Sequence, residues 1–177
     1  MTSEVSGELE WEWVKKAIEQ HQSSLIRYAA SILRDNELAK DVVQDTFIKL
    51  CQTEFSSVKD HLIPWLFRVT RKRALDVLRK EKRMSQFEEP ETMASLADVG
   101  VGEAKDERDK REAIDTLLQL VRSLPGKQRE VVLLKFQQDL SYKEISEITG
   151  MSVSNVGYVL HHALKDLKQR WKMVEAA

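Results

Sequence analysis

The stretch SYKEISEITGMSVSNVGYVLHHALKDL, residues 141–167, predicts two helices joined by a short turn. Ser141 and Glu144 have the spacing of a capping box, in which a hydroxyl and a carboxylate bond each other's backbone amides at a helix N-terminus. Gly150 can end this helix in a left-handed conformation, and Ser152 can cap the next one. A glycine-bearing turn of this length sets two helices near a right angle, as in a helix-turn-helix.

The rest of the chain also has the pattern of helices. Six glycines and three prolines occur in 177 residues, and no stretch shows sustained strand alternation. Apolar residues recur at three- and four-residue steps over about residues 10–33, 37–52, 64–83, 107–122 and 125–138. The short polar stretch TEFSSVKDHLI, between the second and third of these helices, predicts a loop. We therefore expect an all-α protein.

Residues 85–106 interrupt this pattern with a proline, two glycines and little periodicity. Across residues 85–109 there are eight acidic and two basic residues, a composition typical of a flexible acidic linker. A solvated tether without a specific partner is the simplest interpretation. The chain then divides into a helical domain at 10–84, the linker at 85–106, and a four-helix domain at 107–174 that contains the helix-turn-helix.

Basic residues concentrate on the third predicted helix, where residues 68–83 include eight basic and two acidic side chains. Five of these cations fall on overlapping helix faces and are called the cation row: Arg68, Arg71, Lys72, Arg79 and Lys82. Beside Trp65 and Phe67, the cation row suits a phosphate backbone, with rings on which exposed bases can stack. A solvated face with the aromatic residues in the core explains the charge equally well.

Several classes of site find no support in the sequence. Cys51 is the single cysteine and the four histidines are scattered, so we expect no disulfide, metal or cofactor. No apolar run reaches the length of a membrane span, and the N-terminus is acidic rather than a signal peptide, which favours a cytoplasmic protein. The acidic pair Glu88–Glu89 lies in the linker, where nothing would fix its geometry, and no phosphate loop or nucleophile–base arrangement is present. We expect no enzyme.

Three stretches together resemble a sigma factor of the sigma-70 superfamily, in the extracytoplasmic-function (ECF) group, over about residues 15–172. ELAKDVVQDTFIKLCQ is similar to the signature that docks on core RNA polymerase. PWLFRVTRKRALDVLRKEKR is similar to the helix that reads and opens the −10 promoter element. LPGKQREVVLLKFQQDLSYKEISEITGMSVSNVGYVL is similar to the module that reads the −35 element. Each motif alone is moderate evidence, but all three in this order make a specific match.

The resemblance implies a role for each stretch. Contacts with bacterial core RNA polymerase are implied for Asp41, Val42, Gln44, Asp45 and Lys49. Contacts with the opened −10 strand are implied for Ser56, Ser57, Arg68, Arg71, Lys72, Arg73, Arg79, Lys80, Lys82 and Arg83. Contacts with duplex DNA at −35 are implied for Lys143, Ser152, Ser154, Asn155, Tyr158, His161 and His162. Promoter DNA and an anti-sigma factor are the other expected partners, and the free protein is expected to be a monomer.

The sequence departs from the family in the second helix of the helix-turn-helix. Positions that usually carry lysine or arginine hold Gly157, Val159, His162 and Leu164, and Lys72 replaces a usual asparagine. Three interpretations are open: polar and aromatic residues read the bases, the basic helix supplies most affinity, or the altered face binds a protein. The first is favoured. A stand-alone helix-turn-helix regulator, acting as a dimer, and a sigma-like interaction module are the alternative functions.

Overall fold

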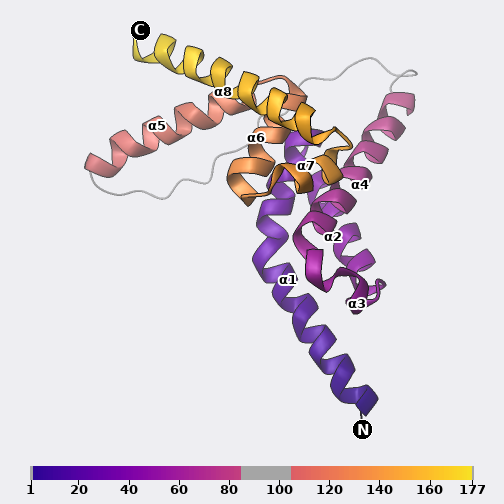
Figure 1. The fold of residues 1–177 in the computed structure, drawn as a ribbon. Helices are drawn as coiled ribbons and strands as arrows, with labels where there is room; N and C mark the ends of the chain where they lie inside the picture. Colours follow the sequence, from indigo (N-terminus) through magenta and orange to yellow (C-terminus); the bar gives the residue numbers. More distant parts are fainter. Residues whose placement is uncertain (1, 85–104, 177) are drawn as a thin grey trace. The chain divides into compact units, whose positions relative to one another are not determined.

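The computed structural model describes residues 2–84 and 105–176, which form two compact units (Figure 1). The first unit is built on helices α1–α4 and the second on α5–α8. Within these described ranges every regular element is an α-helix or a 3-10 turn, which confirms the all-α prediction. The predicted acidic linker lies almost entirely outside the described residues.

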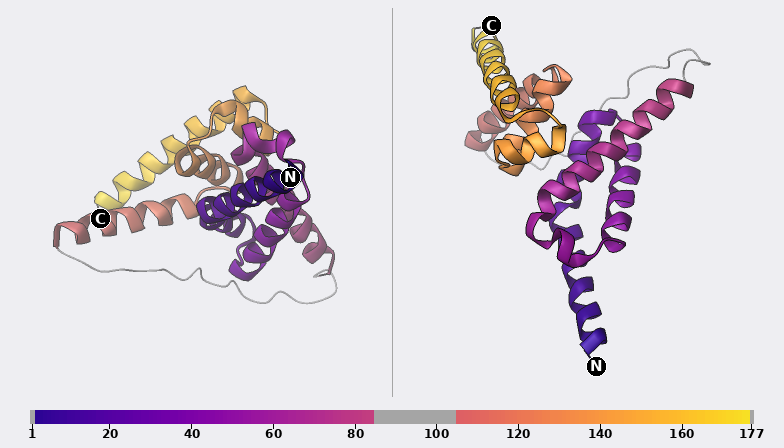
Figure 2. Two further views of the ribbon diagram at one scale, coloured as in Figure 1. Left: turned by 90° about the horizontal axis from the view of Figure 1, so that it is seen from below. Right: turned by 45° about the vertical axis from the view of Figure 1, so that its right-hand side comes forward.

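Three long helices make the first unit: α1 (Thr2–Leu33), α2 (Asn36–Cys51) and α4 (Leu62–Met84). Each of them contacts the other two, and the views of Figure 2 show them side by side. Their apolar stripes meet in a core that includes Leu25, Tyr28, Ala29, Val43, Leu50, Leu66 and Phe67. The rings of Tyr28 and Phe67 pack edge to face in this core, with centroids 5.1 Å apart.

The turn between α1 and α2 shows why the second helix starts where it does. Arg34 takes a left-handed conformation, with φ of 59°, and ends α1. The next residue, Asp35, caps α2: its carboxylate accepts hydrogen bonds from the Glu37 and Leu38 amides at 2.8 and 2.9 Å. The cap satisfies two backbone donors that the helix itself leaves unpaired.

The segment TEFSSVKDHLI is helical, so the predicted loop is wrong. It forms the short helix α3 (Phe55–Val58) and the 3-10 turn η1 (Lys59–His61), which leads directly into α4. Two apolar anchors explain the difference. Val58 is buried, and the Phe55 ring packs edge to face on Trp13 of α1 with centroids 4.8 Å apart. The residues between these two apolar positions are polar, so the composition of the segment predicted a loop.

The second unit contains α5 (Lys105–Arg122), α6 (Gly126–Gln138), α7 (Tyr142–Thr149) and α8 (Val153–Glu175). Helices α7 and α8 form the predicted helix-turn-helix, with Gly150 at φ 75° in the turn. Their core residues are buried, as the sequence predicted: Ile145, Val156, Leu160, Ala163 and Leu167.

The predicted capping box at α7 is also confirmed. The Glu144 amide donates to the Ser141 hydroxyl at 3.3 Å, and the Ser141 amide donates to the Glu144 carboxylate at 2.7 Å. In the turn that follows, the Ser152 hydroxyl accepts from the Asn155 amide at 3.2 Å and so caps α8. The two caps fix the ends of both helices of the motif.

Replacing Ser141 with alanine should destabilise α7 by about 1 kcal/mol, because the hydroxyl that accepts a hydrogen bond from the Glu144 amide is lost. Amide hydrogen exchange over residues 142–149 of the full chain measures this. Ser154→Ala is the matched control, since Ser154 is exposed on α8 and alanine has a higher helix propensity. Equal protection of α7 in the two variants would contradict a stabilising role for the cap.

Candidate functional site

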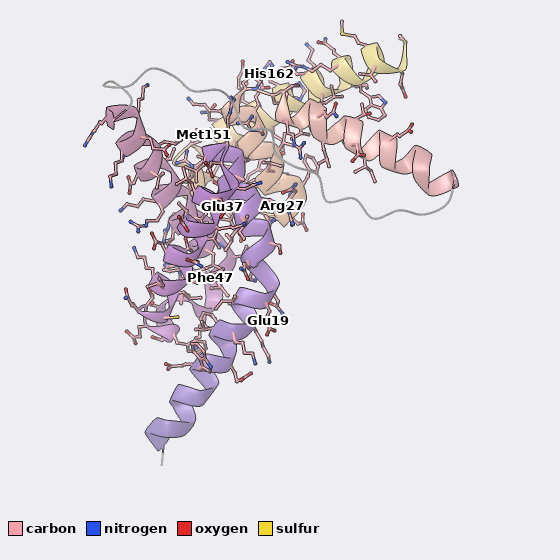
Figure 3. The ribbon with its side chains drawn as sticks, turned by 180° about the vertical axis from the view of Figure 1, so that it is seen from behind. Glu19, Arg27, Glu37, Phe47, Met151 and His162 are labelled. Carbon is pink, nitrogen blue, oxygen red and sulfur yellow. The ribbon has the colours of Figure 1, made fainter. Side chains whose placement is uncertain are left out.

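The outward face of α2 carries one continuous stripe. Asp41, Gln44 and Ile48 follow one another at steps of three and four residues, and all three are exposed. Lys49 is exposed beside this stripe. Figure 3 marks two positions of α2, Glu37 near its start and Phe47 on its buried side. The stripe joins a carboxylate, an amide and an apolar side chain, which is the chemistry of a protein-binding surface with a polar edge.

Two residues on α2 differ from the sequence prediction. Val42 is 2% exposed and lies in the core between helices, so it offers no side-chain surface for the contact with polymerase that the resemblance implies. Ile48, which the sequence reasoning missed, is 55% exposed and takes its place on the surface. The signal was present in the spacing: Ile48 comes four residues after Gln44 and lies away from the buried stripe of Val43, Phe47 and Leu50.

Charged groups near this surface are partly engaged with one another. Lys40 donates to the Glu37 carboxylate at 2.7 Å, which raises the pKa of Lys40 above its ordinary value. Asp45 forms an ion pair with Arg73 of α4. This pair joins one residue implied in polymerase binding with one implied in DNA binding. Since both side chains are about half exposed, the pair contributes at most about 1 kcal/mol to stability.

The cation row lies along α4 as predicted. Arg68, Lys72, Arg79 and Lys82 are exposed, and Arg71 is half-buried. Arg83, also exposed, extends the row at the end of the helix. Asp76 accepts a hydrogen bond from Arg79 at 3.2 Å, so one acidic residue tempers the positive field at its edge.

The remaining predicted residues of α4 lie elsewhere. Arg73 and Lys80 are exposed on a different side of the helix from Arg68, and Arg73 is engaged by Asp45. Trp65 and Phe67 are 7% and 0% exposed and belong to the core, which excludes the aromatic platform, one of the two interpretations that the sequence left open. The burial of these two rings agrees with the other interpretation, while the cationic face above them stays exposed.

Ser56 and Ser57, for which the resemblance implies contacts with the opened −10 strand, lie at the start of α3. Both are exposed, but both hydroxyls are engaged with Glu54: Ser56 donates to its carboxylate and Ser57 to its carbonyl, each at 2.6 Å. Because both hydroxyl protons are donated to Glu54, a base could donate a hydrogen bond to the serine oxygens. To accept a hydrogen bond from either serine, the base would have to displace Glu54.

The exposed side of α8 is neutral and partly aromatic. Ser154, Asn155, Tyr158 and His161 are exposed along its first turns, and Lys165 is the first cation within the helix. The rings of Tyr158 and His162 lie against each other, with centroids 4.2 Å apart and planes tilted by 49° (His162 is marked in Figure 3). On α7, Lys143 is exposed and supplies a cation near this surface. Ser152 is occupied as the N-cap of the helix.

The described parts of the chain hold no cluster of three or more side chains suited to binding a metal ion. Within these same parts, no helix combines the length and apolar character needed to cross a membrane.

Comparison with known proteins matches both units to one family. The model "Sigma-70 region 2" matches residues 17–84, and "Sigma-70, region 4" matches residues 114–167. RNA polymerase sigma factor SigV of Bacillus subtilis is 30% identical over 84% of this chain and 84% of its own. ECF RNA polymerase sigma factor SigM of the same organism is 27% identical over 88% of this chain and 93% of its own.

Two solved structures share the fold. One is the sigma factor RpoE of Bartonella quintana in complex with the anti-sigma factor NepR, with a TM-score of 0.67, 22% identity, and coverage of 89% of this chain and 96% of that one. The other is CnrH in complex with the cytosolic domain of CnrY, with a TM-score of 0.56, 19% identity, and coverage of 90% and 88%. With both family regions present in order, and relatives matched over most of their length, the chain belongs to the ECF group of sigma-70 RNA polymerase sigma factors, which direct promoter recognition.

Proposed function

We propose that this protein is a dissociable initiation factor that binds bacterial core RNA polymerase through α2 and places it on promoters through α4 and α8. The observation that carries this proposal is the succession of three exposed surfaces that coincide with the two matched regions: the α2 stripe, the cation row and the helix-turn-helix. The protein has no catalytic role of its own. It acts in the cytoplasm, where polymerase and chromosome meet.

The α2 stripe docks on polymerase by a small apolar contact with a polar surround. Ile48 supplies the area removed from water, while Asp41 and Gln44 provide directional bonds to basic or amide groups of the partner. Charged and polar groups at such an edge favour correct orientation and fast association more than raw affinity. Asp45 lies on the same side of α2 and adds a second carboxylate to the docking surface, while it also pairs with Arg73.

The cation row binds the opened strand near the −10 element through its phosphates. Each phosphate that is neutralised releases condensed counterions, so binding weakens as salt rises. Because the neighbouring aromatic residues are buried, the row supplies charge without stacking. Strand opening then requires that the sigma factor bind the single strand better than the duplex, since only a difference in affinity can shift the melting equilibrium.

The helix-turn-helix reads duplex DNA at −35 with polar and aromatic groups. The side-chain amide of Asn155 can form a bidentate hydrogen-bonded pair with adenine, which is worth ~1–3 kcal/mol of discrimination against the wrong base. Ser154, Tyr158 and His161 share the exposed side of α8, and the N-terminus of that helix favours a phosphate. Lys143 adds a phosphate contact from α7.

An anti-sigma factor is also proposed as a partner of this protein. One solved neighbour is a complex of that kind, RpoE with the anti-sigma factor NepR. On α5 of this chain Ile114, Leu117 and Leu118 are exposed at neighbouring helical positions, which leaves an apolar face for a partner helix.

The proposal is tested by size-exclusion co-elution of the full chain with core polymerase, followed by sequencing of the promoter fragments that the complex selects from genomic DNA. A complex that enriches fragments sharing −35 and −10 elements is the expected result. A folded, inhibitor-free chain that does not co-elute would overturn it. A dimer that selects a palindromic operator without polymerase would instead identify a stand-alone regulator.

Neutralising two cations of the row, with Arg68→Gln and Arg79→Gln, should weaken binding of the holoenzyme to single-stranded −10 DNA and flatten its salt dependence. Each lost phosphate contact is expected to lower the slope of log affinity against log salt by ~0.7. Titrations at several salt concentrations measure it. Lys15→Gln/Lys16→Gln on α1 is the charge-matched control, because both lysines are exposed and lie outside the row. Equal slopes in both double variants would show that the cation row does not bind the strand.

A further inference from the structure

The recognition surface of α8 has a gap at its centre. Ser154, Gly157, Tyr158 and His161 lie at steps of three, one and three residues and share one side of the helix. Gly157 has no side chain to offer, and a glycine inside a helix costs about 0.5–1 kcal/mol relative to alanine. Its backbone does not require glycine, because among the described glycines the left-handed conformation occurs at Gly150.

Tyr142 of α7 lies over this gap. A Cβ atom added at Gly157 would stand 3.5 Å from Cε2 and 3.8 Å from Cδ2 of the Tyr142 ring. These are ordinary contact distances, so an alanine would fit. The longer lysine or arginine usual at this position would have to pass the ring or displace it. Because residue 157 is glycine, the space above its backbone is free of a side chain, and the Tyr142 ring borders that space.

The ring remains available to a partner. Tyr142 is 41% exposed and is the first residue of α7, directly after the Ser141 cap. In a helix-turn-helix the first helix crosses the DNA backbone and the N-terminal residues of the second enter the major groove. A side chain that reaches from the start of the first helix over the second lies at the border between backbone and groove.

Two more rings continue this surface. Tyr158 is 64% exposed, one position after Gly157, and its ring lies against that of His162 with the planes tilted by 49°. Tyr142, Tyr158 and His162 thus border the place where a cationic reading surface would stand. Neutral rings of this kind suit the C5-methyl group of thymine, the apolar feature of the major groove, and a tyrosine hydroxyl adds a donor and acceptor for a base edge.

We propose that Tyr142 is a specificity-determining residue of this protein and that it reads a thymine methyl in the major groove of the −35 element, next to Tyr158. The inference rests on the proposed function, since it needs α8 to bind duplex DNA. It assigns the two sides of α7 different tasks. Tyr142 selects sequence, while Lys143 holds a phosphate and contributes affinity without selection.

The test uses the holoenzyme and duplex DNA with a randomised −35 element, followed by thymine-to-uracil replacement in the selected sequence. Uracil lacks the methyl group but keeps the pairing. We expect the wild type to lose at least about fivefold in affinity at one uracil position. Tyr142→Ala should bind thymine and uracil duplexes equally at that position, whereas Tyr142→Phe should still discriminate. Lys143→Ala should weaken both duplexes alike and reduce the salt dependence.

Substitutions at Gly157 probe the same contact without removing the tyrosine. Gly157→Ala should keep the thymine preference, because its Cβ fits beside the ring. Gly157→Lys should lose it at the same position, and adding Tyr142→Ala to Gly157→Lys should change nothing more there. Normal circular dichroism of each variant establishes that the fold is intact.

The outcomes separate the two proposals. A wild-type holoenzyme that selects no −35 sequence would overturn duplex reading by α8, and with it this inference. Clear selection by the wild type that Tyr142→Ala leaves unchanged, or a uracil effect equal in both proteins, would overturn the role of Tyr142 alone.

Discussion

Replacing Ile48 with lysine should weaken binding of this sigma factor to core RNA polymerase by about 30-fold, the effect of losing a contact worth about 2 kcal/mol. The side chain is 55% exposed between polar neighbours, so the free protein gives up little packing when it is changed. A lysine there would carry a desolvated charge into the centre of the docked surface. Titration of labelled variant with core polymerase measures the change, mostly as faster dissociation.

A matched control separates this effect from a general change of charge. Gln22→Lys adds the same charge on an exposed position of α1, away from the α2 stripe, and should leave the affinity close to that of the wild type. Thermal unfolding of both variants should also match the wild type. If Ile48→Lys binds polymerase as tightly as Gln22→Lys does, the α2 stripe is not the docking surface.

Most of the fold could be predicted from the sequence because local rules determine it. Helix caps depend on residues within three positions of each other, so the capping box at Ser141 and the N-cap at Ser152 follow from the sequence alone. The apolar period fixes which side of each helix is buried. The predicted loop failed for the opposite reason: α3 is held by the contact of Phe55 with Trp13, a residue about forty positions earlier in the chain.

The exposed positions of the candidate site could be predicted from the sequence, but the pairings between its helices could not. Periodicity puts Asp45 and Arg73 on exposed positions but does not show that they meet across α2 and α4. The hydroxyls of Thr46 and Thr70 are likewise 3.1 Å apart inside the core, a contact that no local pattern indicates. Such pairs depend on the crossing of two helices, which the sequence of either one leaves open.

Val42 and Ile48 show that a family resemblance assigns a role to a stretch, whereas burial differs from one position of the stretch to the next. Asp41, Val42, Gln44 and Asp45 are neighbours in the motif, so a role assigned to the stretch was carried to each of them. On a helix, neighbours point about 100° apart, and Val42 turns into the core while Ile48 stands beside Gln44. The helical period is the better guide to which residues of a matched motif can touch a partner.

Replacing Phe67 with alanine should lower the free energy of unfolding of the first unit by about 3–5 kcal/mol, because the ring is fully buried and its loss leaves a cavity. Tyr28, which packs edge to face on it, loses its partner in the variant. Urea denaturation of the full chain, followed by hydrogen exchange in α1 and α4, measures the loss. A double-mutant cycle with Tyr28→Leu should give a coupling of about 0.5–1.5 kcal/mol.

This experiment also decides between the two roles weighed for the aromatic residues of α4. A ring that stacks on an exposed base would cost little stability when removed and would cost binding of single-stranded DNA instead. Trp11→Ala provides the matched comparison, since this ring in the same unit is 61% exposed and its removal should cost less than about 1 kcal/mol. If Phe67→Ala were as stable as Trp11→Ala and lost only strand binding, Phe67 would lie on the DNA surface and the core described for α1, α2 and α4 would be wrong.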